Sequence, residues 1–203
     1  MLRGTNLAVS YGDSPVFEHL DVDVPDSGMT AVCGPSGSGK STLLAVLGAL
    51  MEPDDGMVLL DGRPLTPARA RTSISWVPQG NNLLPHRTVA ANASLGLVGV
   101  RASERRARTL ESIDAVGLLV RRRNRAGTLS GGEAQRLAIA RAHARGCPWI
   151  FADEPTGQLD RRNTEIVVAV LRGLRDTDRG LLVATHDPLV LEAADHVVDL
   201  ASP

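Results

Sequence analysis

The stretch Gly34–Ser41 constrains this chain more than any other. It reads Gly-Pro-Ser-Gly-Ser-Gly-Lys-Ser and matches the phosphate-binding loop G-x-x-x-x-G-K-[ST] without a substitution. The apolar run Met29–Cys33 before it predicts a buried strand, and Thr42–Leu50 after it predicts a helix. Strand, glycine-rich turn and helix are the context that this motif requires. The sequence therefore predicts a phosphate site at this turn.

The residue types in the loop suit an anionic ligand. Gly34, Gly37 and Gly39 allow the backbone to approach a phosphate and to adopt angles that a Cβ forbids. Their N–H groups and the helix N-terminus present partial positive charge. Lys40, the only lysine among the 22 lysine and arginine residues, adds a full charge, and Ser41 offers a hydroxyl to Mg²⁺. The residues expected to hold the nucleotide here are Gly34, Pro35, Ser36, Gly37, Ser38, Gly39, Lys40, Ser41 and Thr42. This loop alone leaves kinases, GTPases and transport ATPases open.

The composition describes an ordinary soluble globular chain. The 203 residues are enough for one well-cored domain, and a hydrophobic content of 43% with 22% charged residues is typical of such proteins. Aromatic residues make up only 2%, so we expect an aliphatic core. The net charge of −1 gives no reason to expect a nucleic acid ligand. We expect a cytoplasmic protein with no targeting signal and no membrane span of its own.

The two cysteines, Cys33 and Cys147, lie beside apolar runs and far apart in the sequence. This placement favours reduced core residues, although a disulfide between them stays open at this stage.

Short apolar stretches separated by turn residues predict strands and hairpins before the phosphate-binding loop. Tyr11, the sole tyrosine, follows the first of these strands. It is either an aromatic residue at a strand edge or a ring that stacks on a nucleotide base. After the loop helix we expect strands at Met57–Leu60 and Ile74–Val77, and the second runs directly into Pro78-Gln79.

Residues 87–118 change character, because helical periodicity extends over Thr88–Val98 and Ser103–Leu118. This helical insert between αβ segments is the one candidate subdomain. It closes on the arginine-rich run Arg121–Arg125, which is either a solvated face or a contact for a partner or an anionic surface.

The last third of the chain alternates helices and strands. We expect a helix at Ala134–Arg145, a strand at Trp149–Ala152, a helix at Arg161–Leu174 and a strand at Leu181–Ala184, followed by a final helix and strand. Alternation of this kind predicts a mainly parallel sheet covered on both faces, with the hairpins forming an antiparallel part. The predicted fold class is therefore α/β.

Several motifs follow one another in a fixed order, and with them the chain resembles the nucleotide-binding subunit of an ABC transporter. Leu129-Ser130-Gly131-Gly132-Glu133 resembles the ABC signature motif. By its residues alone, Ser130 to Glu133 is a helix capping box, and such a helix N-terminus is an anion site. The resemblance implies that this helix N-terminus faces the γ-phosphate held by a second subunit.

The segment Trp149–Asp153 resembles a Walker B strand, and the resemblance implies that Asp153 holds Mg²⁺ and that Glu154 activates the attacking water. His186 matches the histidine that contacts the γ-phosphate in this family. Gln79 matches the glutamine that touches the metal and the water, in a loop that carries motion to the membrane partner, and residues 81–86 would lie near that partner. Asp160 ends a segment, Gly157–Asp160, that resembles the loop crossing the dimer interface.

The implied division of labour assigns three groups of residues. Catalysis falls to Glu154, His186 and Gln79, and metal binding to Ser41, Gln79 and Asp153. Nucleotide contacts outside the phosphate-binding loop fall to Tyr11, Ser130, Gly131, Gly132, Glu133 and Asp160. The resemblance also implies a single ABC ATPase domain over 1–203, with a core of 1–78 and 146–203 and a helical subdomain of 79–145.

The family works by sandwiching ATP between two copies of the domain. The implied ligands are ATP and Mg²⁺, and the implied partners are a second ATPase subunit, with a homodimer favoured over a heterodimer, and transmembrane permease subunits. The chain would then lie on the cytoplasmic face of a membrane. The sequence from Ala152 to Asp160 is most similar to that of the branch that serves lipoprotein-release, macrolide-export and cell-division permeases. This similarity favours export over import. The transported substrate is left open.

Soluble ABC ATPases are the alternative. Members that act on DNA or ribosomes, or that assemble cofactors, share the same motifs. Chromosome and repair members carry long coiled coils between the two halves, and the sequence between Lys40 and Leu129 has no heptad run. Translation factors are usually tandem, whereas this chain holds one copy of each motif.

Overall fold

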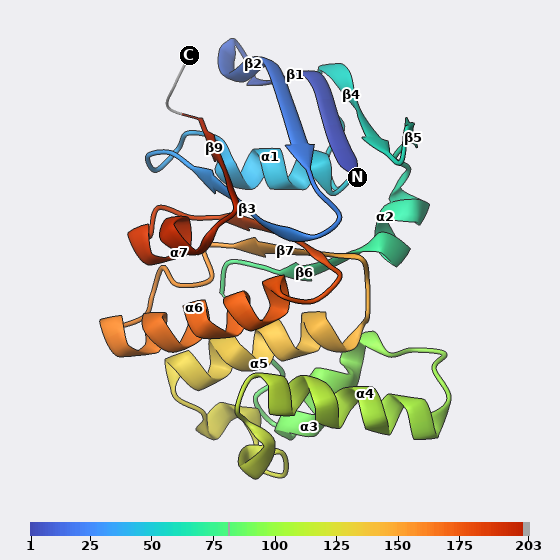
Figure 1. The fold of residues 1–203 in the computed structure, drawn as a ribbon, viewed down its shortest axis with the longest axis vertical. Helices are drawn as coiled ribbons and strands as arrows, with labels where there is room; N and C mark the ends of the chain where they lie inside the picture. The colour runs from blue at the N-terminus through green and yellow to red at the C-terminus, as the bar shows by residue number, and fades with distance from the viewer. Residues whose placement is uncertain (81, 201–203) are drawn as a thin grey trace.

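A parallel sheet runs through the middle of the molecule (Figure 1). The structure is a computed structural model that describes residues 1–80 and 82–200. Within those residues, five parallel strands pair in the order β6-β7-β8-β3-β9. They are β3 (Gly28–Cys33), β6 (Ile74–Val77), β7 (Trp149–Asp153), β8 (Gly180–Ala184) and β9 (His196–Asp199). The inner strands are apolar along almost their whole length because helices or a second sheet cover both faces.

A second, antiparallel sheet lies beside the first, in the order β2-β1-β4-β5. Its strands are β1 (Leu2–Tyr11), β2 (Ser14–Val24), β4 (Asp55–Leu60) and β5 (Arg63–Pro64). Helix α1 (Lys40–Leu47) lies between the two sheets (Figure 1). Its buried leucines and Val46 join Phe151 and Trp149 of the parallel sheet in one core. The helix that follows the phosphate-binding loop is therefore held on both sides.

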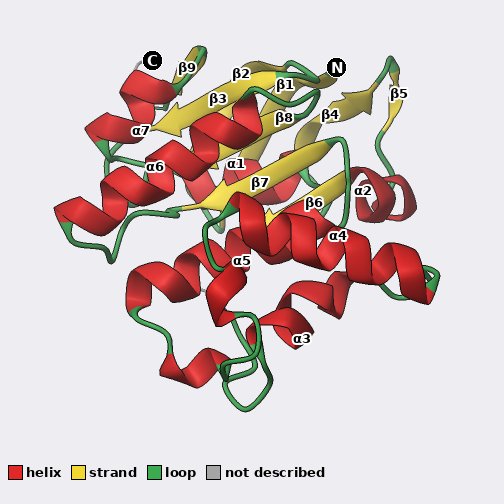
Figure 2. Cartoon of the chain, turned by 60° about the horizontal axis from the view of Figure 1, so that its bottom comes forward, coloured by secondary structure: helices red, strands yellow, loops and turns green. Residues whose placement is uncertain are grey.

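The other face of the parallel sheet carries the remaining helices (Figure 2). Helices α5 (Gly131–Ala144), α6 (Arg161–Arg175) and α7 (Pro188–Ala193) cover it directly. Helices α3 (Val89–Ala93) and α4 (Ala102–Ala115) pack below α5, with the short 3₁₀ turns η1 (Ser94–Gly96), η2 (Leu119–Arg121) and η3 (Ala126–Thr128) between the helices. A second core of aliphatic residues joins α3, α4, α5 and α6 to the sheet.

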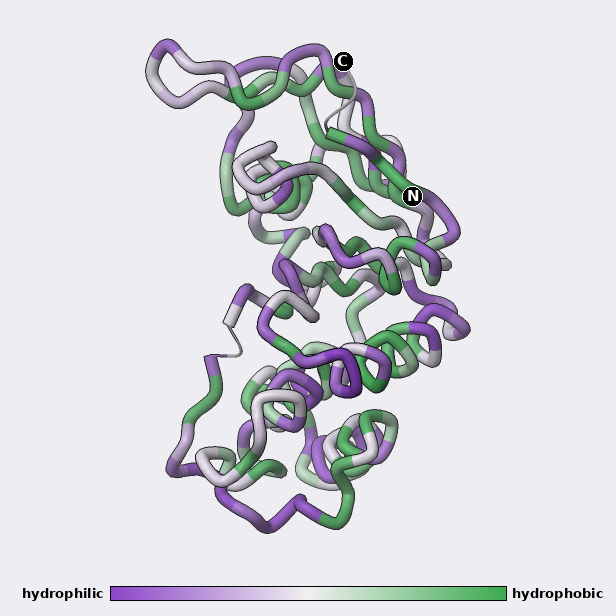
Figure 3. The backbone as a smooth tube through the Cα atoms, turned by 90° about the vertical axis from the view of Figure 1, so that its left-hand side faces the viewer, coloured by the Kyte–Doolittle hydropathy of each residue, from purple (hydrophilic) through white to green (hydrophobic). Residues whose placement is uncertain are grey.

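The helical end of the molecule presents hydrophilic stretches on its outside (Figure 3). Within it, Ile113 and Leu137 are fully buried, whereas Arg105 and Arg106 of α4 are exposed. This end contains the insert predicted from the helical periodicity. Its delimitation as a subdomain of 79–145 stays a prediction.

The observed elements follow the sequence-based ones closely where the pattern is strong. The strand Ile74–Val77 has its predicted bounds. Helix α1 begins at Lys40 instead of Thr42 and ends at Leu47 instead of Leu50. It ends there because Gly48 caps it and Ala49 adopts a left-handed φ of 51°.

In the helical insert, the helix predicted over Thr88–Val98 is wrong in its second half. It ends at Ala93 and continues as a 3₁₀ turn, and Leu97 leaves the helical region with a ψ of 40°. Helix α2 (Pro67–Ser73) was not predicted. A side-chain cap from Thr66 and a proline in the first turn mark its start in the sequence.

The expectation of reduced cysteines is confirmed, because Cys33 and Cys147 are both free thiols. The aliphatic core is also confirmed, with Phe151 as its largest fully buried side chain. Across the described residues, no helix has the length and apolar character needed to span a membrane.

Gly48 and Gly173 allow a matched test of how tightly α1 is held. A Cβ at Gly48 would collide with the ring of Trp76 on β6, whereas a Cβ at Gly173 on the exposed side of α6 meets nothing within 4 Å. We expect Gly48→Ala to lower the free energy of unfolding by about 1–3 kcal/mol through overpacking. Gly173→Ala should raise it by about 0.5–1 kcal/mol, because alanine favours the helix. Urea denaturation of both variants measures this, and a neutral Gly48→Ala would contradict the packing.

Candidate functional site

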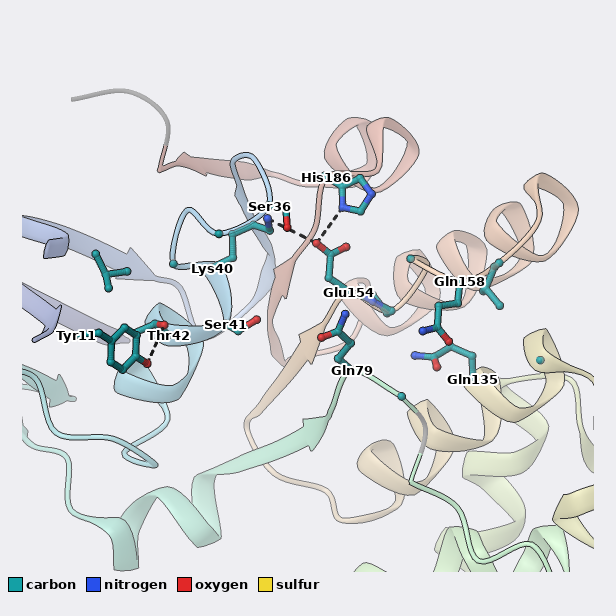
Figure 4. A pocket seen from close by; sticks show the side chains of 18 residues that line it. Tyr11, Ser36, Lys40, Ser41, Thr42, Gln79, Gln135, Glu154, Gln158 and His186 are labelled. Carbon is teal, nitrogen blue, oxygen red and sulfur yellow. Dashed lines mark hydrogen bonds and ion pairs between the residues drawn. The ribbon is translucent and has the colours of Figure 1, made fainter. Parts of the chain in front are cut away.

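The carboxyl ends of four neighbouring parallel strands meet at one edge of the sheet, and this edge carries the predicted site. Gly34 follows β3, Glu154 follows β7, His186 lies two residues after β8, and Gln79 lies two residues after β6. Ligands of open α/β sheets bind outside this edge. A cleft of about 580 Å³ opens there, and Lys40, Gln79, Glu154 and His186 all line it (Figure 4).

The phosphate-binding loop forms one wall of the cleft. Gly39 precedes α1 with a left-handed φ of 91°, and a Cβ there would collide with Val16 of β2. Glycine is therefore required by both the backbone angle and the space. Lys40 is only 7% exposed, and its Nζ donates hydrogen bonds to the carbonyl oxygens of Gly34 (2.9 Å) and Pro35 (3.0 Å). The loop thus holds the buried ammonium of Lys40 at the N-terminus of α1.

Ser41, which lines the cleft, contacts Asp153 directly. The Ser41 hydroxyl donates a 3.0 Å hydrogen bond to Oδ1 of Asp153. Burial raises the pKa of Asp153, the hydrogen bond from Ser41 opposes this rise, and the negative charge of Glu154 adds to it. A cation beside these oxygens would offset the cost of burying the carboxylate.

Glu154 is the most constrained residue of the site. Its Oε1 accepts a hydrogen bond from Nδ1 of His186 at 3.0 Å and lies 3.7 Å from Nζ of Lys40. Its Oε2 is buried and, among the described residues, has no hydrogen-bond partner. Its backbone has a φ of 46°, which is uncommon for a residue with a side chain. Such local strain clusters at functional sites, where the surrounding structure holds it in place.

Tyr11 lies at the opposite end of the cleft, at the end of β1. The residue is 60% exposed, and its hydroxyl lies 3.5 Å from Oγ1 of Thr42. The side chain therefore lies beside the first turn of α1 and is largely open to solvent. Its stacking on a base stays a prediction.

The signature segment, residues 129–133, reaches the same cleft through Gly131, at the end away from Tyr11. The Ser130 side chain accepts a hydrogen bond from the Glu133 N–H, and the Glu133 carboxylate accepts one from the Ser130 N–H at 2.9 Å. This is the capping box that the sequence predicted. The Ser130 N–H lowers the pKa of Glu133, with help from the charge of Arg121, whose Nε lies 3.3 Å from the carboxylate.

Most of the predicted site residues line the cleft, and some do not. Those that line it are Tyr11, Ser36, Gly37, Gly39, Lys40, Ser41, Thr42, Gln79, Gly131, Glu154 and His186. Those outside the lining are Gly34, Pro35, Ser38, Ser130, Gly132, Glu133, Asp153 and Asp160. Asp160 instead caps α6, where its side chain accepts a hydrogen bond from the Asn163 N–H at 2.8 Å.

Sequence reasoning missed part of the lining. Val16, Gly80, Gln135 and Pro155 line the cleft without having been predicted as site residues. Gln135 was detectable, because it is one helical turn after Gly131 and so shares its face. Val16 was not, because only the pairing of β2 with β1 brings it next to Gly39.

The site offers hard oxygen donors to a small cation. The hydroxyl of Ser41, the carboxylate of Asp153 and the amide of Gln79 are the types of ligand that Mg²⁺ accepts. Among the described residues, no cluster of three or more His, Cys, Asp or Glu side chains could hold a metal ion by itself. This set therefore suits an ion bound jointly with phosphate oxygens and water.

Comparison with known proteins identifies what the chain is similar to. The family model described as ABC transporter matches residues 17–157. The "Uncharacterized ABC transporter ATP-binding protein YvrO" of Bacillus subtilis is 37% identical over 98% of this chain and 92% of its own length. The "Macrolide export ATP-binding/permease protein MacB 1/2" of Paracoccus denitrificans is 36% identical over 98% of this chain. The match spans only 32% of that larger protein.

Solved structures agree with the sequence comparison. The "Dimeric structure of a post-hydrolysis state of the ATP-binding cassette MJ0796 bound to ADP and Pi" superposes with a TM-score of 0.84 at 31% identity. The match covers 98% of this chain and 94% of that one.

The Glu133 capping box generates a pH-dependent prediction. Because the fold lowers the pKa of Glu133 below its ordinary value of 4.5, its ionised form stabilises the folded state. This contribution is fully present above pH 4.5 and is lost as the pH falls through the lowered pKa. We expect Glu133→Gln to cost about 0.5–1 kcal/mol of unfolding free energy near neutral pH. The cost should shrink as the pH falls below 4.5 and through the lowered pKa. Denaturation of both proteins across this range measures the difference, and a constant difference would contradict the assignment.

Proposed function

The chain belongs to the ABC transporter family and is an ATP-binding, ATP-hydrolysing subunit, and from this premise we propose that it powers a separately encoded membrane permease from the cytoplasmic face. One observation carries the catalytic part of the proposal. Lys40 begins α1, after the loop that follows β3, while Glu154 and His186 follow β7 and β8, and the three residues meet in one cleft. A buried ammonium next to a paired carboxylate and imidazole is the arrangement that phosphoryl transfer to water requires.

Nucleotide binding falls to the phosphate-binding loop and Tyr11. The N–H groups of the loop and of the first turn of α1 would hold the β- and γ-phosphates, with Lys40 supplying a full charge. Tyr11 lines the other end of the cleft and is largely exposed, so its ring could stack on an adenine that extends there. The cleft volume of about 580 Å³ lies in the normal range for small-molecule sites.

Ser41, Asp153 and Gln79 would hold Mg²⁺ together with the phosphates, and the ion would neutralise the charge that develops on the transferred phosphoryl group. The fit rests on the chemistry of these donors and on the burial of Asp153. A partly buried carboxylate with a second acid, Glu154, beside it is suited to a hard cation.

Glu154 is the proposed general base. It would accept a proton from the attacking water while His186 holds its Oε1 through Nδ1. The second oxygen, Oε2, is buried and has no hydrogen-bond partner among the described residues, so its capacity to accept a proton or a hydrogen bond is unused. Gln79, which also lines the cleft beside Glu154 (Figure 4), would orient the same water.

The signature segment is proposed to act on a second copy of the chain. Ser130, Gly131, Gly132 and Glu133 form a capped helix N-terminus that would meet the γ-phosphate of the partner copy. Asp160 stands outside the cleft lining and would contribute at the same dimer interface. The similar protein MJ0796 was solved as a dimer with ADP and phosphate, which supports a homodimer here.

Hydrolysis has a sharp test in two substitutions. Lys40→Ala removes the charge at the phosphates and should weaken ATP binding by roughly 10- to 100-fold. Glu154→Gln removes the base and should lower kcat by about 10²- to 10⁴-fold while ATP still binds. Isothermal titration and a phosphate-release assay measure the two effects.

Glu165→Gln is the matched control, because it makes the same chemical change on a surface carboxylate of α6 that pairs with Arg161. It should leave turnover unchanged. Normal turnover by Glu154→Gln would remove Glu154 from its role, and tight ATP binding by Lys40→Ala would remove the phosphate assignment.

A groove on the helical end is the proposed docking place of the permease. It has a volume of about 610 Å³, and small side chains of α3, including Ala90 and Ala91, line it together with Leu110 of α4. Four arginines, two from α4 and two from residues 122–123, also line it: Arg105, Arg106, Arg122 and Arg123. An apolar floor with a basic rim is complementary to a short amphipathic helix that carries acidic side chains. We assign this occupant to a cytoplasmic segment of the permease, in the branch whose relatives include a macrolide exporter.

Recovery of the partner from native membranes tests this docking and the rival function together. Tagged Glu154→Gln with ATP and Mg²⁺ should co-purify a multi-helix membrane protein, identified by mass spectrometry. Adding Arg106→Glu should reduce the recovery severalfold, because it reverses one charge on the groove rim. Arg172→Glu, an equal charge reversal on α6, should not.

Recovery of ribosomes, DNA-bound proteins or only soluble assembly factors would favour a soluble ABC ATPase instead. Equal losses with Arg106→Glu and Arg172→Glu would remove the docking assignment from the groove.

A further inference from the structure

A fully buried amide in α3 makes more hydrogen bonds than any side chain of the cleft, yet it lies outside the cleft. Asn92 has 0% exposure. Its Oδ1 accepts a hydrogen bond from the Leu84 N–H at 2.8 Å. Its Nδ2 donates to the carbonyl oxygens of Leu84 (3.0 Å), Thr88 (3.1 Å) and Arg87 (3.4 Å). One side chain thus holds the backbone of residues 84–88, the segment that follows Gln79.

Main-chain hydrogen bonds join that segment and the start of α3 to a second segment, residues 122–127. The N–H groups of Val89 and Ala90 donate to the carbonyls of Asn124 and Arg122, at 2.9 and 3.0 Å. In the reverse direction, the N–H groups of Ala126 and Gly127 donate to the carbonyls of Arg87 and Pro85, both at 2.9 Å. The two segments approach so closely that a Cβ at Gly127 would lie 3.1 Å from the Pro85 carbonyl oxygen.

The second segment leads directly into the signature helix. The Leu129 N–H donates to the Ala126 carbonyl, and Ser130 is the next residue and the N-cap of α5. Arg121, one residue before residues 122–127, forms an ion pair with Glu133 of the capping box, with 3.3 Å between Nε and Oε1. The position of this helix N-terminus therefore depends on residues 122–127, and theirs depends on residues 84–90.

We propose that Asn92 is a positioning residue that fixes the signature helix N-terminus relative to the segment following Gln79. The proposal rests on the proposed two-copy arrangement, in which Ser130 and Gly131 complete the site of the partner copy. Asn92 acts through those residues and touches no substrate. A displacement of residues 84–88 or of the adjoining groove is then transmitted to Ser130 through these hydrogen bonds. A flexible loop without them would not transmit it.

The chemistry of the contact requires an amide. Asparagine supplies one acceptor and two donor hydrogens on a short side chain. Leucine has a similar volume but makes none of these four hydrogen bonds. The Leu84 N–H would lose its acceptor, whereas the three carbonyl oxygens would keep only their main-chain donors. Aspartate keeps the acceptor but sets a carboxylate against three carbonyl oxygens in a buried place.

The test separates nucleotide binding from ATP-driven association. All variants carry Glu154→Gln so that ATP is retained, and two quantities are measured: ATP affinity by titration of dilute protein, and dimer formation by analytical ultracentrifugation over a range of ATP concentrations with Mg²⁺. We expect Asn92→Leu to leave ATP affinity within twofold and to raise the ATP concentration for half-dimerisation at least tenfold. A merely structural role would move the melting temperature without this split.

Thr88→Val is the matched control. It removes the hydroxyl that caps α3, which accepts a 3.1 Å hydrogen bond from the Ala91 N–H, but it leaves the carbonyl that Asn92 binds. This variant should melt at a lower temperature and dimerise normally. Gly127→Ala is the second test variant, because it perturbs the same contact from the exposed side and does not depend on the buried amide. It should share the dimerisation defect of Asn92→Leu.

The outcomes distinguish the two levels of the argument. Failure of Glu154→Gln itself to dimerise with ATP would overturn the proposed two-copy function, and the inference with it. Dimerisation of that parent protein together with normal dimerisation of Asn92→Leu and Gly127→Ala would overturn the inference alone. If Asn92→Leu does not fold, Gly127→Ala decides by itself. An equal defect in Thr88→Val would reduce the effect to loss of α3 stability and would also overturn the inference.

Discussion

The parallel register of β3, β8 and β7 is the constraint on which the site depends. Val32 pairs with Ala184, and Ala184 pairs with Asp153, so the three strands end in one row. Two further hydrogen bonds extend this ladder past the strands, from the Thr185 N–H to Val32 and from the Glu154 N–H to Ala184. A slip of one residue would send each following side chain to the opposite face of the sheet. The meeting of Glu154, His186 and Lys40 is thus a result of strand pairing that the buried apolar side chains specify.

The packing around this edge of the sheet holds Glu154 in its strained conformation. Glu154 combines a left-handed backbone with a buried carboxylate oxygen that has no partner among the described residues, and each feature costs free energy. The strands below it are buried on both faces, by α1 on one side and by α5 and α6 on the other. Departures from local preference of this kind are expected where a fold carries chemistry. The site is preorganised because the sheet leaves Glu154 little freedom to relax.

Much of this arrangement could be predicted from the sequence because it is encoded locally. The strand before Gly34 and the capping box at Ser130 depend on residues within a few positions of each other, and both were found with their chemistry. Helix α2 was missed although Thr66 and Pro67 mark its start, because a seven-residue helix has too little periodicity to stand out. The early end of α3 was missed because the apolar pattern continues past Ala93 while the backbone tightens into a 3₁₀ turn.

What could not be predicted depends on backbone pairing between distant segments. The contact of Val16 with Gly39 follows from the pairing of β2 with β1, and residues 84–90 meet residues 122–127 through main-chain groups that any sequence carries. Asn92 is visible in the sequence only as a polar residue in an apolar stretch. In the structure that polarity has a cause, since four main-chain groups converge on one amide. A motif search finds the two ends of such a connection, Gln79 and Ser130, whereas the connection itself appears only once each buried polar group is traced to its partner.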